Sequence, residues 1–284
     1  MGDTIQMEWG RLEHPELEAA HGRAGQGPPL LFLHGWGVGP RSYAGALRQV
    51  AAAGCAVAAP AQPGFGGTPG LDADQRHFPG YARWAARYLD ALEEGRRVVV
   101  VGHSFGGGVA LQLAHDYPER VRAVVLCNAV GGPHRHDTRE HRPMAQRPLW
   151  EWGRELGADL FGLSSVVRIL PPVLEEAVPN FVQHPMAMWR VAEFVRRADL
   201  LPQASAVAAM GIPLTMIWSD RDRLIPRAAF TALCQAAGVD GHVVPGFHSW
   251  MIADPVRFAD LVWRAAVEAG AVDHMLVRRP AIAL

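Results

Sequence analysis

The sequence contains 284 residues, of which 49% are hydrophobic and 19% are charged, and its formal net charge is −1. These values describe a soluble globular chain with a sizeable core, and they give no electrostatic reason to expect nucleic acid or an anionic membrane as a partner. The sequence contains arginine but no lysine. This absence excludes Schiff-base chemistry, a lysine general base and a phosphate-binding loop of the Walker type.

Neither a membrane span nor an export signal is expected. No run of about 18 apolar residues occurs, which is the minimum for a membrane-spanning helix. Residues 1–18 carry acidic side chains and lack an apolar signal core, so we expect a cytoplasmic protein. The three cysteines, Cys55, Cys127 and Cys234, are scattered along the chain. Their odd number and spacing indicate neither a disulfide framework nor a metal site.

Apolar runs alternate with helical patterns along the first half of the chain. One or two short strands are expected within residues 5–18, followed by a loop over Gly22–Pro29. The buried strands that follow are expected at 30–33, 56–59, 98–101 and 121–128, and the helices at 43–53, 81–92 and 109–114. This alternation predicts an α/β fold with a mostly parallel sheet covered by helices on both faces. Ligands of such folds bind beyond the carboxyl ends of the strands.

A candidate nucleophile lies between the strand that begins at Val98 and the helix that follows it. Gly102-His-Ser104-Phe-Gly106 has the G-x-S-x-G pattern of a sharp strand-to-helix turn. Such a turn holds the serine in a strained backbone conformation, and the glycines let neighbouring backbone pass close to it. The alternative interpretation is an ordinary serine in a glycine-rich turn. We favour Ser104 as a nucleophile, with His103 supporting the turn.

Residues 133–205 differ from the rest of the chain. They are rich in proline, arginine and bulky apolar side chains, and they lack strand-like runs. Helices are expected over Glu151–Phe161 and Met188–Leu200. We interpret residues 133–205 as a helical lid inserted into a core domain that comprises residues 1–132 and 206–284. Most lid aromatics are expected to pack against the core, and a minority to line an apolar pocket.

The remaining core elements are strands at 212–218 and 242–245 and helices at 228–237 and 255–269. A serine nucleophile needs a base, and the base needs an orienting carboxylate. His248 is the candidate base because it follows a strand and lies in a loop that begins at Gly246. Asp220 and Asp222 both follow a strand, and we favour Asp222 because it lies deeper in its loop. Either aspartate could instead be a solvated loop acid paired with a neighbouring arginine.

The order Ser104, Asp222, His248, together with the strand–turn–helix context of the serine, resembles the α/β-hydrolase family over nearly the whole chain. His34-Gly-Trp36-Gly37 is similar to the oxyanion loop of that family, and residues 133–205 lie where its variable lid lies. The resemblance implies an oxyanion hole formed by the backbone N–H groups of Trp36 and Phe105. It also implies a catalytic triad of Ser104, Asp222 and His248.

The resemblance implies a serine hydrolase that cleaves an ester-type bond of a small, largely apolar substrate through an acyl-enzyme. A serine at this strand-to-helix turn, the nucleophile elbow, disfavours the related enzymes that open epoxides or displace halide, which use a carboxylate there. The alternatives are hydrolysis of a thioester, lactone or carbon–carbon bond, a cofactor-free peroxidase side activity, and a non-catalytic binding protein on the same fold. We expect a small-molecule substrate, no cofactor and no metal, and the sequence indicates no particular oligomeric state.

Overall fold

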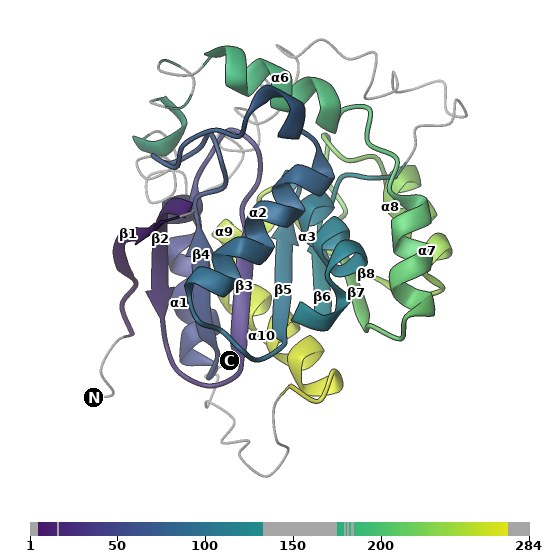
Figure 1. The fold of residues 1–284 in the computed structure, drawn as a ribbon. Helices are drawn as coiled ribbons and strands as arrows, with labels where there is room; N and C mark the ends of the chain where they lie inside the picture. The colour runs from purple at the N-terminus through teal and green to yellow at the C-terminus, as the bar shows by residue number, and fades with distance from the viewer. Residues whose placement is uncertain are drawn as a thin grey trace.

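An eight-stranded sheet organises the part of the chain that the structure describes (Figure 1). The structure is a computed structural model, and it describes residues 5–15, 17–132, 175–178, 180, 182 and 185–271. The strand order is β1-β2-β4-β3-β5-β6-β7-β8. The strands are β1 (Glu8–His14), β2 (Leu17–Ala24), β3 (Pro29–Leu33), β4 (Ala56–Pro60), β5 (Val98–His103), β6 (Val121–Cys127), β7 (Leu214–Ser219) and β8 (Gly241–Val244).

Strands β4, β3, β5, β6, β7 and β8 pair in parallel, whereas β1 and β2 form an antiparallel edge beside β4. The mostly parallel sheet flanked by helices that the sequence predicts is therefore confirmed. Parallel pairing brings the carboxyl ends of these strands to one edge of the sheet. Ser104, Asn128 and Asp220 each come directly after one of these ends.

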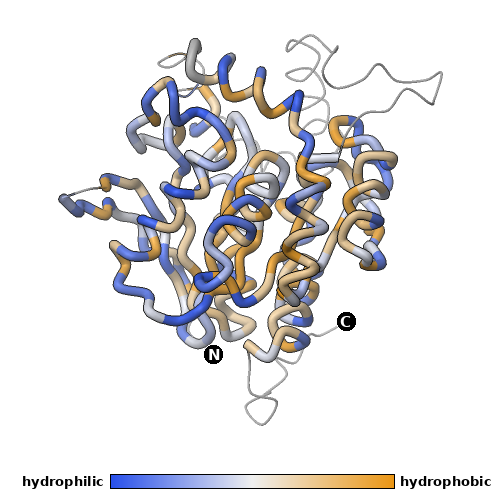
Figure 2. The backbone as a smooth tube through the Cα atoms, turned by 45° about the vertical axis from the view of Figure 1, so that its right-hand side comes forward, coloured by the Kyte–Doolittle hydropathy of each residue, from blue (hydrophilic) through white to orange (hydrophobic). Residues whose placement is uncertain are grey.

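Helices cover both faces of the sheet (Figure 1). They are α1 (Ala44–Ala52), α2 (Phe78–Ala91), α3 (Phe105–Asp116), α6 (Pro185–Val195), α7 (Leu201–Ala209), α8 (Arg227–Ala237), α9 (Trp250–Ala253) and α10 (Pro255–Glu268), with 3₁₀ turns η1 (Pro40–Tyr43), η2 (Ala73–Gln75) and η3 (Pro118–Arg120). Helices α2, α3, α7 and α8 share one buried cluster, and α1 and α10 share another. Many of the most hydrophobic residues lie along the backbone in the middle of the molecule (Figure 2).

The central strand β5 explains why two clusters form. Val98 and Val100 belong to the cluster under α2 and α3, whereas Val99 and Val101 belong to the cluster under α1 and α10. Successive side chains of a strand point to opposite faces, so a run of four valines fills both cores. This placement fixes the strand that leads into Ser104 between two packed layers.

Several sequence predictions differ in their bounds from the observed elements. The helix predicted over 109–114 is α3, which begins at Phe105 and ends at Asp116. The loop predicted over Gly22–Pro29 is shorter, because β2 continues to Ala24 and pairs with both β1 and β4. A Cβ at Gly22 would collide with the ring of Trp9, so this glycine makes room for a cross-strand aromatic contact rather than for a turn. The helix predicted over Met188–Leu200 is α6, which both begins and ends earlier.

Of the predicted lid, residues 175–178, 180, 182 and 185–205 are described, whereas the helix predicted over Glu151–Phe161 lies outside the described residues. Helix α6 lies across the end of the sheet where the parallel strands finish (Figure 1). Helix α7, which the sequence did not predict, packs against α3 and α8, and the predicted boundary at residue 205 falls inside it. None of the helices in the described ranges has the length and apolarity that crossing a membrane requires.

Candidate active site

Ser104 occupies the strained turn that the G-x-S-x-G pattern predicts. Its backbone angles are φ 53° and ψ −116°, a region that costs a non-glycine residue about 1–3 kcal/mol. The Ser104 N–H donates to the Cys127 carbonyl at 3.0 Å, which ties the turn to the neighbouring strand. A Cβ at Gly102 would collide with the Gly106 carbonyl, and one at Gly106 with the Leu33 carbonyl. The predicted need for glycine at both positions is therefore confirmed.

His248 and Asp222 form a buried pair beside this turn. His248 Nδ1 lies 2.9 Å from Asp222 Oδ2, and both side chains are almost fully buried. The other oxygen, Oδ1, accepts the backbone N–H groups of Leu224 at 2.7 Å and Ile225 at 2.9 Å. A carboxylate only accepts hydrogen bonds, so His248 Nδ1 carries the proton and Nε2 keeps its lone pair. The ring is thereby prepared to accept a proton at Nε2.

Asp220, the alternative acid, contacts the backbone of the histidine loop. Its side chain is 52% exposed, and its Oδ1 accepts the Gly246 N–H at 2.9 Å. Arg221 lies 3.8 Å from the same carboxylate and stacks over the Phe247 ring. Asp220 thus shapes the loop that carries the histidine, and Asp222 is the aspartate that contacts the imidazole.

The Asn128 side chain joins the acid to β7 and α9, and sequence reasoning assigned it no such role. Its Nδ2 donates to Asp222 Oδ2 at 2.5 Å and to Ser219 Oγ at 2.7 Å, and its Oδ1 accepts the Trp250 indole N–H at 2.9 Å. Ser219 Oγ in turn donates to the Phe247 carbonyl at 2.8 Å. Asn128 has a positive φ of 46°, uncommon for a residue other than glycine. Its position at the end of β6 was the signal available in the sequence.

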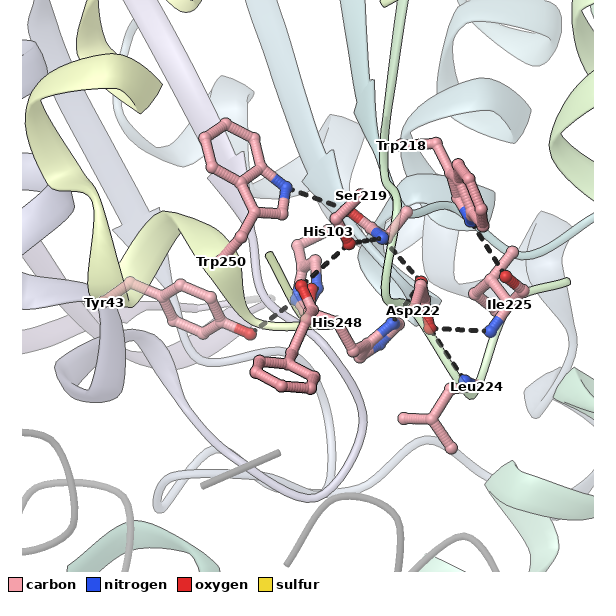
Figure 3. Close-up of polar contacts among 11 residues, drawn as sticks. Tyr43, His103, Trp218, Ser219, Asp222, Leu224, Ile225, His248 and Trp250 are labelled. Atoms are coloured by element: carbon pink, nitrogen blue, oxygen red, sulfur yellow. Dashed lines mark hydrogen bonds and ion pairs between the residues drawn. The ribbon is translucent and has the colours of Figure 1, made fainter. Parts of the chain in front are cut away.

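The ring of His103 connects the turn to Tyr43 and to the loop that carries His248. Its ring is buried, with Nε2 3.0 Å from the His248 carbonyl and Nδ1 2.7 Å from the Tyr43 hydroxyl (Figure 3). Because a carbonyl can only accept, Nε2 carries the proton and Tyr43 donates to Nδ1. The Tyr43 oxygen accepts the Gly35 N–H at 3.2 Å. Burial above all, and the nearby His248, keep the pKa of His103 well below its usual value.

The loop after β3 carries the predicted oxyanion-hole residue Trp36. Its first residue, His34, is fully buried and is held by Gln62, whose backbone N–H donates to His34 Nε2 at 2.8 Å. His34 Nδ1 therefore carries the proton and donates to the Gly35 carbonyl at 2.8 Å. Phe105 is the first residue of α3, where N–H groups have no acceptor within the helix. The packing of Gly106 against Leu33 brings these two backbone segments together.

Two buried neutral histidines predict a loss of stability in mild acid. Burial lowers the pKa of His34 to about 4. As the pH falls below about 6.5, the histidine is therefore protonated in the unfolded chain but stays neutral in the folded chain. The free energy of unfolding should therefore fall between pH 7 and pH 5, by about 2 kcal/mol for His34 alone, and His103 acts in the same direction. Urea unfolding at pH 7, 6 and 5 measures this. A constant or rising free energy over that range would contradict it.

Within the described ranges, no group of three or more His, Cys, Asp or Glu side chains could hold a metal ion. All three cysteines are buried and free. Burial raises the pKa of the Cys127 thiol well above its usual range and that of Cys55 to about 12. A buried thiol whose pKa is raised is a poor nucleophile. Around the elbow, Ser104 is accordingly the side chain suited to nucleophilic attack.

Comparisons with known proteins show which proteins the chain is similar to. One relative is a protein of Mycobacterium phage D29 that carries the provisional name non-heme haloperoxidase. It is 28% identical to this chain over 256 residues, which cover 86% of this chain and 89% of the relative. A pimeloyl-[acyl-carrier protein] methyl ester esterase of Aeromonas salmonicida is 24% identical over 258 residues, 84% of this chain and 96% of the relative.

Solved structures share the fold. A serine hydrolase involved in carbazole degradation superposes with a TM-score of 0.74 at 19% identity, covering 92% of this chain and 99% of the other. The sequence model that describes the alpha/beta hydrolase family matches residues 30–261, which include the elbow, both aspartates and His248. The chain belongs to the alpha/beta hydrolase family.

Proposed function

We propose that this protein is a serine hydrolase that cleaves a carboxylic ester-type bond of a small, largely apolar substrate. Membership of a hydrolase family supports an enzyme, and an esterase among the relatives supports ester chemistry. The observation that carries the proposal is the buried Asp222–His248 pair. Because His248 Nδ1 holds its proton against Asp222, Nε2 can act as a base beside the turn at residues 103–104. The rings of His103 and His248 lie 4.7 Å apart, centre to centre.

In the proposed reaction, Ser104 Oγ attacks the substrate carbonyl carbon while its proton passes to His248 Nε2. Asp222 stabilises the imidazolium, and the N–H groups of Trp36 and Phe105 bind the oxygen that becomes negative. Collapse of this intermediate breaks the bond to the leaving group, which takes the proton from His248. Water then repeats the sequence on the acyl-enzyme and releases the acid. Residues 133–205 would form the lid of the substrate pocket, over a core of residues 1–132 and 206–284.

A panel of p-nitrophenyl esters from acetate to dodecanoate, with a thioester, a lactone and a vinylogous diketone, tests the proposal. We expect ester hydrolysis at short or medium chain length, with a covalent acyl-enzyme visible in the mass spectrum after rapid acid quenching. Preferential turnover of another member of the panel would reassign the bond. The absence of both turnover and acyl-enzyme across the panel would favour a binding protein.

A further inference from the structure

A buried carboxylate, from the stretch that precedes α6, is bonded to the start of η1, which follows the oxyanion loop. Glu176 is 8% exposed, and its two oxygens accept four hydrogen bonds. The donors are the backbone N–H groups of Gly39 and Arg41, both at 3.1 Å, and the N–H and hydroxyl of Ser42, both at 2.8 Å. Burial raises the pKa of Glu176, and the donors from Ser42, Arg41 and Gly39 oppose that rise.

These donors belong to the start of η1, which runs directly into α1. The first N–H groups of a helix have no acceptor within it, and no side chain of η1 itself caps them. Pro40 has no N–H group. The Glu176 carboxylate therefore accepts every backbone N–H of residues 39–42 that is available. A Cβ at Gly39 would lie 2.5 Å from Glu176 Oε1, so glycine is required for this close approach. The site is thus shaped around the carboxylate.

Two further contacts join the same parts of the chain. The Trp36 indole N–H donates to the Met188 carbonyl of α6 at 3.0 Å. Asn180 Oδ1 accepts the Gly66 N–H at 3.0 Å, and its Nδ2 lies 3.5 Å from the Gly37 carbonyl. Residues 36–42 are therefore held at several points by side chains or backbone from residues 176–188. We call this set of contacts the loop clasp.

The end of η1 extends the clasp to the candidate active site. Tyr43, the last residue of η1, accepts from the Gly35 N–H and donates to His103, which donates to the His248 carbonyl (Figure 3). The Gly35–Trp36 peptide thus lies between Tyr43 on one side and the indole contact of Trp36 with α6 on the other. A shift of η1 would move the N–H of Trp36, the proposed oxyanion donor.

We propose that Glu176 is a positioning residue for the oxyanion hole, acting through η1 on the backbone N–H of Trp36. This inference rests on the proposed function. An oxyanion donor binds charge that exists only in the transition state, so its displacement lowers kcat and leaves KM nearly unchanged. A residue that only packed the neighbouring segment would change KM or thermal stability instead.

The test compares Glu176→Ala and Glu176→Gln with Glu175→Ala, a matched control in which the neighbouring exposed carboxylate is removed. We expect Glu176→Ala to lower kcat by about 10- to 30-fold, less than the roughly hundredfold loss of deleting an oxyanion donor, with KM changed less than threefold. Glu176→Gln keeps the volume but turns an NH₂ group toward N–H donors, so it should show a smaller loss. Glu175→Ala should retain wild-type kcat.

A trifluoromethyl ketone gives the readout that separates positioning from packing. Serine adds to its carbonyl to form a tetrahedral hemiketal, and the ionised oxygen of this adduct mimics the oxyanion. Its affinity should fall in parallel with kcat in both Glu176 variants, whereas the affinity of the matching methyl ketone should not. Equal losses for the two ketones, or wild-type kcat in the Glu176 variants, would overturn the inference. Should Glu176→Ala fail to fold, Ser42→Ala, which removes one donor of the clasp, should lower kcat by about two- to threefold through the same hydrogen-bond loss.

Fluorophosphonate labelling of the wild-type protein separates this inference from the proposed function. If the wild type is not labelled, the serine-hydrolase proposal itself fails. If it is labelled, and the Glu176 variants are labelled and turn over at the same rate, only the positioning role of Glu176 fails.

Discussion

Replacing Ser104 with alanine should abolish ester hydrolysis. Removing the nucleophile of a serine hydrolase lowers kcat by at least about 10⁴-fold, because neither water nor a neighbouring side chain can replace the activated hydroxyl. Ser104 is the only residue of the G-x-S-x-G turn with a nucleophilic hydroxyl, and the thiol of the neighbouring Cys127 is buried with a raised pKa. The fold should survive, because removing a single hydroxyl leaves the backbone contacts of the turn intact.

The measurement is kcat/KM on a p-nitrophenyl ester together with labelling by a fluorophosphonate probe. Ser205→Ala is the matched control, because Ser205 is exposed on α7 and lies outside the G-x-S-x-G turn. We expect full labelling and activity in the wild type and in the control, and neither in Ser104→Ala. Labelling of Ser104→Ala at the wild-type rate would remove this residue from the mechanism.

Asp222→Asn should lower kcat by about 10⁴-fold, whereas Asp220→Asn should stay within about threefold of the wild type. An amide at position 222 can present an NH₂ group to His248 Nδ1, which then becomes the acceptor and leaves Nε2 protonated. That tautomer cannot take the proton of Ser104. Asparagine at position 220 still offers an oxygen to the Gly246 N–H, so the histidine loop keeps its bond.

Both variants are compared by their pH–rate profiles and by urea unfolding at pH 7. Asp222→Asn should lose activity at every pH at which the wild type is active, while remaining folded. Comparable activity in the two variants, or a larger loss in Asp220→Asn, would exchange the roles of the two aspartates.

Sequence patterns predicted the central strands and helices because a buried element has a characteristic spacing of apolar residues. The valines of β5 face two cores, and a run of four β-branched residues that ends in a glycine turn is typical of a strand buried on both faces. Strand β2 was predicted too short because Gly22 is required by the Trp9 ring on the paired strand β1. Helix α7 was missed because it lies at the end of a stretch interpreted as a lid. Pairing partners and neighbours across the fold decided these elements.

Local features of the chain were enough to predict a parallel α/β core, the strained serine turn, and the candidate residues Ser104, Asp222 and His248. Each of these predictions follows from what adjacent residues carry: apolar runs, glycine positions and residue types after strands. The three-dimensional arrangement was needed to show which aspartate meets the imidazole, and how Asn128 and Glu176 hold the surrounding loops. Glu176 and Ser42 are 134 residues apart in the chain. A hydrogen bond between such residues depends on the spatial register of separate loops, which no local pattern encodes.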